Sequence, residues 1–107
     1  MKTHSGQISS PTSVDTLAVH AGREDFRTLG IHAPPIDFST TYPVGSLDTG
    51  VESIDRLAAG EASASDAIYA RLHNPTVARY ERALASLERT PEAVAFGSGM
   101  ALSLIHI

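Results

Sequence analysis

The sequence predicts an α/β fold, and two patterns carry that prediction. Apolar side chains recur every three or four residues over 75–89, which is the spacing of an amphipathic helix. The apolar run 93–96 is followed by Gly97-Ser98-Gly99 and then by a further apolar stretch, which is typical of a buried strand that turns into a helix. A flexible leader over 1–14 and an arm over 15–67 precede these elements.

Composition narrows the functional classes. The 107 residues suffice for one modest domain, and 42% apolar with 19% charged residues is typical of a globular protein. A formal charge of −4 argues against nucleic-acid binding. Cysteine is absent, which excludes disulfides and cysteine nucleophiles, and no histidines stand at metal-ligand spacing. We therefore expect no metal site.

The leader carries no targeting signal. It is rich in serine and threonine and lacks the apolar stretch of a secretory signal. The longest apolar runs of the chain are four residues, whereas a membrane span needs roughly 20. We expect a cytoplasmic protein that contacts no membrane.

The arm begins without regular periodicity. Residues 15–44 are interrupted by Gly22, Gly30 and Pro34-Pro35, so we expect them to run extended over a neighbouring surface, with a poor strand candidate at 36–42. A helix is predicted over 51–59. Thr49 and Glu52 have the capping-box spacing before it, and Gly60 fits its left-handed end.

The helix over 75–89 has the clearest boundaries. Asn74 is a favoured N-cap, and Pro75 suits the first helical position because its missing N–H is not needed there. Thr90-Pro91 ends the helix, since the residue before a proline is pushed out of the helical region. Its apolar positions are Val77, Tyr80, Leu84 and Leu87.

The turn around Gly97-Ser98-Gly99 is a candidate anion site. Glycines let a backbone approach an anion closely, and the free amides of a helix start point toward it. A plain strand-to-helix turn explains the same residues. Leu102 stands where a dinucleotide fingerprint needs a small residue, and Phe96 stands where a nucleophile elbow needs glycine. Ser98 is therefore an anion ligand or a cap rather than a nucleophile.

A second anion candidate lies before the long helix. Alternate residues of an extended segment point the same way, so Tyr69 and Arg71 can present a phenol and a guanidinium to one phosphate. A surface arginine beside a packing tyrosine is the alternative reading.

Three blocks together resemble a known family. Residues 16–22 (TLAVHAG) with Pro34-Pro35-Ile36 and 39–42 (STTY) resemble the N-terminal arm of the Cys/Met-metabolism family of pyridoxal-phosphate (PLP) enzymes. The stretch 69–76 (YARLHNPT) resembles the family's Y-x-R-x-x-N-P-T block, and 95–101 (AFGSGMA) resembles its S-G-M-A-A segment. The likeness covers 15–101.

The resemblance implies the aspartate-aminotransferase-like fold (fold type I), with 68–107 as the incomplete start of the cofactor domain. It implies that the amides of Ser98, Gly99 and Met100 hold the cofactor phosphate. It also implies that Tyr69 and Arg71 reach the phosphate in the neighbouring subunit's site of a homo-oligomer, expected as a homotetramer.

The implied activity is β- or γ-elimination or replacement on sulfur-containing or O-acylated amino acids. The family's reactive lysine has no counterpart, because Lys2 is the sole lysine, so we expect no catalytic residue here and an inactive fragment. Residues 102–107 depart from the family pattern and are suspected to be foreign. Two alternatives stay open: a self-contained phosphate- or nucleotide-binding module, and an arm that only mediates subunit contacts.

Overall fold

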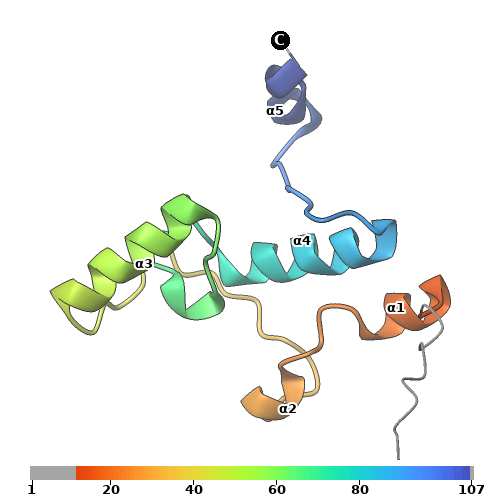
Figure 1. Ribbon diagram of the computed structural model, residues 1–107, viewed down its shortest axis with the longest axis horizontal. Helices are drawn as coiled ribbons and strands as arrows, with labels where there is room; N and C mark the ends of the chain where they lie inside the picture. The colour runs from red at the N-terminus through yellow and green to blue at the C-terminus, as the bar shows by residue number, and fades with distance from the viewer. Residues whose placement is uncertain (1–11, 107) are drawn as a thin grey trace, which may run out of the picture.

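A computed structural model describes residues 12–106 as a set of helices joined by extended segments (Figure 1). Within that range the only β-pairing is a single antiparallel bridge between Thr41 and Tyr69. The helices in chain order are α1 (Val14–His20), α2 (Phe26–Leu29), α3 (Leu47–Ala59), η1 (Ala64–Asp66), α4 (Pro75–Glu88), α5 (Gly99–Ser103) and η2 (Leu104–His106).

Helix α4 confirms the predicted long helix. The side chain of Asn74 accepts hydrogen bonds from the amides of Thr76 (2.9 Å) and Val77 (3.2 Å), so two of the unpaired amides at the helix start are satisfied. Arg89 ends the helix in the left-handed conformation with φ 54°. The predicted end at 89 is therefore correct to within one residue.

Helix α3 is longer than predicted. It begins at Leu47, one turn before the expected start at Val51, because Ser46 and not Thr49 is the N-cap. The Ser46 hydroxyl accepts a hydrogen bond from the Thr49 amide at 3.2 Å, so Thr49 lies inside the first turn. Gly60 ends the helix with φ 75°, as predicted.

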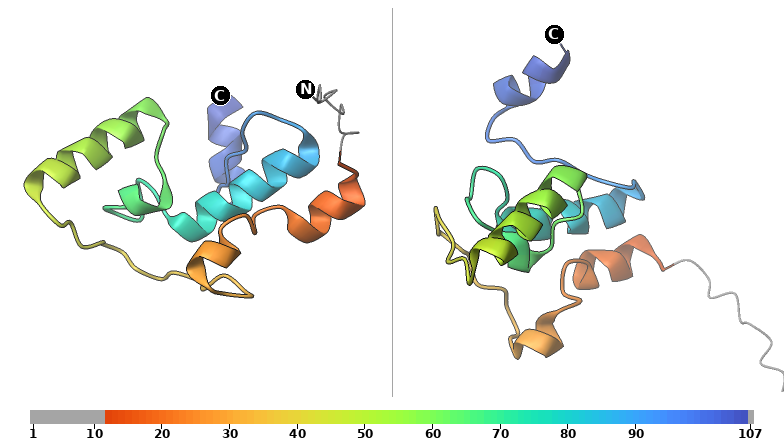
Figure 2. Two further views of the ribbon diagram at one scale, coloured as in Figure 1. Left: turned by 60° about the horizontal axis from the view of Figure 1, so that its bottom comes forward. Right: turned by 60° about the vertical axis from the view of Figure 1, so that its left-hand side comes forward.

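The expectation that 15–44 runs extended is wrong for its first half. Helices α1 and α2 form there, and α1 packs beside α4 (Figures 1 and 2). Ser13 caps α1 locally by accepting from the Thr16 amide at 3.3 Å. Arg79 of α4 holds the turn between the two helices, because it donates to the Gly22 carbonyl at 2.7 Å and forms an ion pair with Asp25. Of the leader predicted over 1–14, residues 1–11 lie outside the described range, and Val14 already belongs to α1.

The strand predicted over 93–96 is also wrong for the described residues. The segment is extended but pairs with no strand, and Val94 is 69% exposed. One hydrogen bond holds it to α4, from the Ala95 amide to Glu81 Oε1 at 2.8 Å. An α/β fold needs partner strands, and the nearest candidate, 36–42, contributes only the bridge at Thr41.

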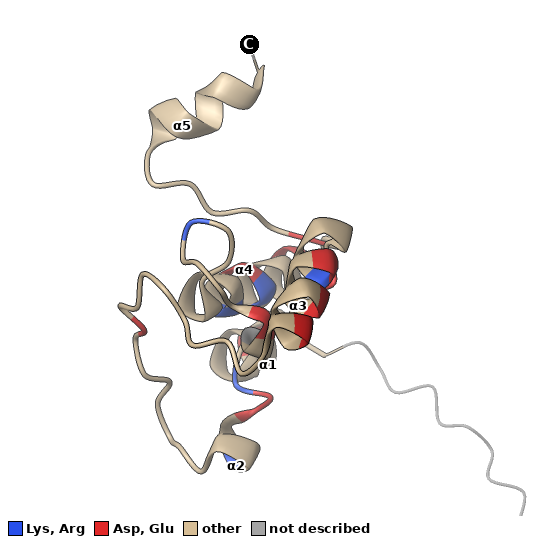
Figure 3. Ribbon diagram, turned by 90° about the vertical axis from the view of Figure 1, so that its left-hand side faces the viewer, with Lys and Arg blue, Asp and Glu red and all other residues tan. Residues whose placement is uncertain are grey.

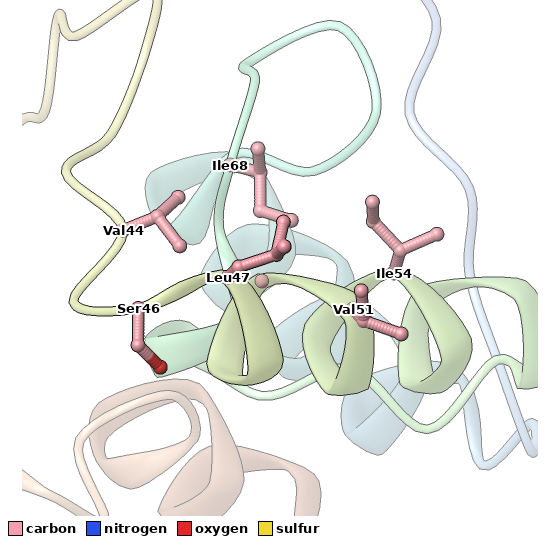
Figure 4. A pocket seen from close by; sticks show the side chains of 7 residues that line it. Val44, Ser46, Leu47, Val51, Ile54 and Ile68 are labelled. Carbon is pink, nitrogen blue, oxygen red and sulfur yellow. The ribbon is translucent and has the colours of Figure 1, made fainter.

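Little apolar surface is buried. The buried apolar side chains among the described residues are Ala67, Ala78 and Ala85, whereas Phe38 is 88% and Leu47 is 82% exposed. Along α3 an open apolar groove of about 450 Å³ is lined mainly by aliphatic side chains from the helix and from flanking segments (Figure 4). Such exposed apolar surface is typical of chain that packs against further protein. No described helix is long and apolar enough to cross a membrane.

Candidate functional site

Tyr69 is held from both sides by backbone hydrogen bonds. The Tyr42 amide donates to the Ile68 carbonyl at 3.0 Å, and the Ala70 amide donates to the Thr40 carbonyl at 2.9 Å. The Tyr69 carbonyl then accepts from the His73 amide at 3.1 Å, which closes the turn that leads into α4. The backbone at Tyr69 is therefore fixed by contacts from a segment about thirty positions earlier and by the helix that follows.

Arg71 lies directly against Tyr69, as the alternation of side chains predicts. Its guanidinium donates to the Tyr69 hydroxyl at 3.1 Å and its central carbon lies 5.0 Å from the centre of the ring. Arg71 is exposed, and within 12–106 no carboxylate forms an ion pair with it. The remaining guanidinium donors are thus available to an anion, and two of them match the geometry of a phosphate.

The segment before Tyr69 is anchored by a buried carboxylate. Asp66 is 1% exposed and accepts hydrogen bonds from Arg56 Nε (2.7 Å) and from Ser53 Oγ (3.2 Å), both on α3. Ser63 adds its amide and its hydroxyl, each at 2.8 Å. The hydrogen bonds from Arg56 and then those from Ser63 hold the pKa of Asp66 well below its usual range, so the carboxylate is ionised at neutral pH.

The segment after Arg71 is attached to residue 37. The Asp37 amide donates to Thr76 Oγ1 at 2.9 Å, and Asn74 Nδ2 donates to the Asp37 carbonyl at 3.4 Å. Two buried polar atoms beside this region, Tyr42 Oη and His73 Nε2, have no hydrogen-bond partner among the described residues. Burial and then the Asp37 charge raise the pKa of the Tyr42 hydroxyl, which is therefore protonated.

The second predicted group lies at the start of α5. The Ser98 hydroxyl accepts a hydrogen bond from the Ala101 amide at 3.2 Å, so Ser98 is the N-cap. The amides of Gly99 and Met100 have no backbone or side-chain acceptor within residues 12–106. A Cβ at Gly97 or Gly99 would meet nothing within 4 Å, so space for an anion exists beside this turn.

The two groups do not meet within this chain. Helix α5 stands away from α1, α2 and α3 (Figure 1), and no hydrogen bond or ion pair in the described range joins 69–71 to 98–100. The expectation that Tyr69 and Arg71 serve a neighbouring subunit does not require the two groups to meet.

Sequence reasoning missed the Asp66 anchor. No element was predicted between Gly60 and residue 67, although Ser63 and Asp66 have the spacing of a capping box, which the structure forms in η1. That spacing was the available signal. The Asp25–Arg79 pair left no such signal, because its partners are 54 positions apart.

The Tyr69–Arg71 pair before the N-cap of α4 and the amides of Gly99 and Met100 in the glycine turn are donor groups of the kind that bind a phosphate. Residues 15–107 match the family described as Cys/Met metabolism PLP-dependent enzyme, and the chain belongs to that family. The resemblance stated from the three sequence blocks is thereby confirmed, and PLP is the cofactor of the family.

Relatives of this chain are named L-methionine gamma-lyase or homocysteine/cysteine synthase. The chain is 58% identical over 92 residues (83% of this chain, 22% of the relative) to an L-methionine gamma-lyase of Streptomyces avermitilis. It is 49% identical over 89 residues (81% and 23%) to an L-methionine gamma-lyase of Brevibacterium sandarakinum. It is 33% identical over 100 residues (91% and 21%) to a homocysteine/cysteine synthase of Kluyveromyces lactis. The chain spans about a fifth of the length of these curated relatives, and no solved structure gives a significant match.

Proposed function

We propose that this chain supplies the phosphate contacts of a PLP-dependent enzyme that carries out β- or γ-elimination or replacement on sulfur-containing or O-acylated amino acids. The observation that carries the proposal is the Tyr69–Arg71 pair, in which an exposed guanidinium without a carboxylate partner is oriented by a phenol. The names of the relatives favour a sulfur amino acid such as methionine as substrate. We further propose a cytoplasmic homo-oligomer.

The residues present fit the phosphate of the cofactor. Arg71 offers a permanent charge and two parallel donors, and Tyr69 offers a hydroxyl beside them. The amides of Gly99 and Met100 and the hydroxyl of Ser98 offer further donors at a turn with open space. Bound PLP supplies the electron sink for cleavage at the β- or γ-carbon.

In this proposal the role of the chain is binding and orientation. Tyr69 and Arg71 hold the phosphate in the site of the neighbouring subunit, while residues 98–100 hold the phosphate in the site of their own subunit. Fixing the phosphate from two sides holds the reactive end of the cofactor in one place, which is the contribution expected of a positioning group. Because Lys2 is the sole lysine, the reactive amine is not assigned to any residue here.

A hybrid enzyme tests the proposal. It joins residues 15–101 of this chain to the remainder of the Streptomyces avermitilis relative, which then supplies that amine. The measurement is the Kd for PLP and the Kd for pyridoxal, which lacks the phosphate. Arg71→Ala should weaken PLP binding by about 10- to 100-fold and leave pyridoxal binding unchanged, because one charged hydrogen-bonding group is lost.

The control is Arg82→Ala, which removes an exposed α4 arginine that has no ion pair within residues 12–106. It should change neither Kd. Equal affinities of the Arg71→Ala and unmodified hybrids for PLP would contradict the proposed phosphate contact. A hybrid that folds but binds no PLP would contradict the whole proposal.

A further inference from the structure

Asp66 is more completely buried than any other charged residue in the described range, yet no part of the proposed phosphate site touches it. It stands three positions before Tyr69, at the last residue of η1. Five donor groups surround its two oxygens: Nε and an amino group of Arg56, the Ser53 hydroxyl, and the amide and hydroxyl of Ser63. A carboxylate bound this fully is held in one orientation.

The cluster joins two elements that otherwise share few polar contacts. Ser53 and Arg56 belong to α3, whereas Ser63 and Asp66 belong to the turn that leads into Tyr69, and α3 packs against this turn. The position of Asp66 relative to α3 thus sets where the segment 67–71 starts. Ala67, directly after it, is buried as well.

From Asp66 onward the segment is fixed at every second residue. Ile68 and Ala70 bond to the backbone of 40–42, and the Tyr69 carbonyl closes the following turn. The side chains of Tyr69 and Arg71 then contact each other and no other side chain through a hydrogen bond or ion pair in the described range. The direction of these two side chains therefore depends on the course of the backbone, which is fixed from Asp66 onward.

We propose that Asp66, bound by Arg56 and Ser53 of α3, is a positioning residue that sets the direction of Tyr69 and Arg71 toward a phosphate. This inference rests on the proposed function of that pair. Removing the Asp66 charge leaves Arg56 without its strongest partner and frees the turn from α3, so the pair loses its fixed direction while keeping both side chains.

The first test uses the hybrid enzyme without PLP. Asp66→Asn should raise the amide exchange rate of Ala70, whose hydrogen bond to Thr40 follows the anchor, by about tenfold or more. An unchanged Ala70 exchange rate would overturn the positioning role whatever the cofactor does.

The second test uses the hybrid enzyme and the same pair of ligands. Asp66→Asn should reduce the preference for PLP over pyridoxal by about tenfold, since misplaced phosphate donors weaken only the phosphate contact. In a hybrid that already carries Arg71→Ala, Asp66→Asn should have no further effect on that preference. Independent, additive losses would overturn the proposal.

Controls separate positioning from general stability. Asp25→Asn breaks the matching aspartate–arginine pair between α2 and α4, away from Tyr69, and should leave the preference for PLP unchanged. Ser53→Ala removes one neutral donor to Asp66 and keeps the ion pair, so it gives a folded variant with a smaller loss of preference if Asp66→Asn fails to fold. A Ser53→Ala hybrid with full preference and unchanged Ala70 exchange would also count against the proposal. If Arg71→Ala leaves the preference unchanged, the proposed function itself fails.

Discussion

Residues 66–90 and residues 91–106 carry the two halves of the proposed phosphate contact, and they are built differently. The first stretch is tied to α3, to the backbone of 40–42 and to α2 by hydrogen bonds and ion pairs. The second has one hydrogen bond to α4 and a helix cap of its own. From residue 93 to 106 it contains no lysine, arginine, aspartate or glutamate (Figure 3).

The difference shows which contacts fix the conformation of each of the two stretches. Tyr69 and Arg71 are oriented by contacts already present in the chain. The amides of Gly99 and Met100 are exposed and have no partner within residues 12–106, so water satisfies them until an anion or further protein covers them. We therefore expect changes at the anchoring contacts of the first stretch to alter the structure of the chain, and changes in the second to alter mainly its binding.

Acid should have the largest effect, and it should act on the first stretch. The pKa values of Asp66 and of Asp25, which pairs with Arg79, are lowered, chiefly by hydrogen bonds from Arg56 and Arg79 respectively. A lowered folded-state pKa contributes stability above the unfolded value of 3.8, and that stability is lost as the pH falls further. The near-ultraviolet circular dichroism of the tyrosines should thus decline below about pH 4.

This signal does not come from the second stretch, because all three tyrosines lie before residue 81. Asp15→Asn, which removes a carboxylate without an ion pair in the described range, should leave the acid midpoint unchanged. A tyrosine signal that stays constant from pH 6 to pH 2 would show that these carboxylates do not hold the first stretch together.

A paired glycine substitution gives a smaller effect. Gly22 has φ 82°, and an added Cβ would lie 3.2 Å from Ala83 Cβ, so Gly22→Ala introduces both backbone strain and crowding against α4. It should lower the unfolding free energy, followed by the tyrosine signal in urea, by about 2 kcal/mol. Gly97→Ala, where a Cβ meets nothing, should change it by less than about 0.5 kcal/mol. Equal losses would remove the distinction between the two stretches.

Local sequence signals predict those helix boundaries that are set by hydrogen bonds between neighbouring residues. Asn74-Pro75, Gly60 and the serine before Gly99 mark helix boundaries by contacts within a few residues, and these boundaries were predicted nearly correctly. Tyr69 and Arg71 were placed together by the alternation of an extended segment alone.

The remaining features depend on contacts between distant residues. The turn between α1 and α2 could not be predicted, because Arg79 holds Gly22 and Asp25 from more than fifty positions away, whereas the local N-cap of α1 at Ser13 was overlooked. The strand at 93–96 was predicted from its apolar run, but a strand also needs a partner, which the described residues do not provide. The Asp66 anchor was missed because its capping-box spacing lies in a stretch that otherwise reads as a loop.

Removing the N-caps of α4 and α5 is the comparison with the smallest expected effect. Asn74→Ala removes the acceptor of two amides and the hydrogen bond to the Asp37 carbonyl, so it should lower the unfolding free energy by about 1 kcal/mol. Ser98→Ala removes one cap from a helix that stands apart, so the tyrosine signal in urea should not change.

The order should reverse for ligand binding in the hybrid enzyme. Ser98→Ala removes a proposed phosphate donor and should weaken PLP binding by about tenfold or more without altering pyridoxal binding, since a hydrogen bond to a charged group is worth about 1.5 to 3 kcal/mol. Asn74→Ala should act on both ligands equally or on neither, because its contacts are to the backbone of this chain. If Ser98→Ala instead destabilises the isolated chain as much as Asn74→Ala does, then α5 is part of the same cooperative unit, and its free amides are held in place before any phosphate arrives.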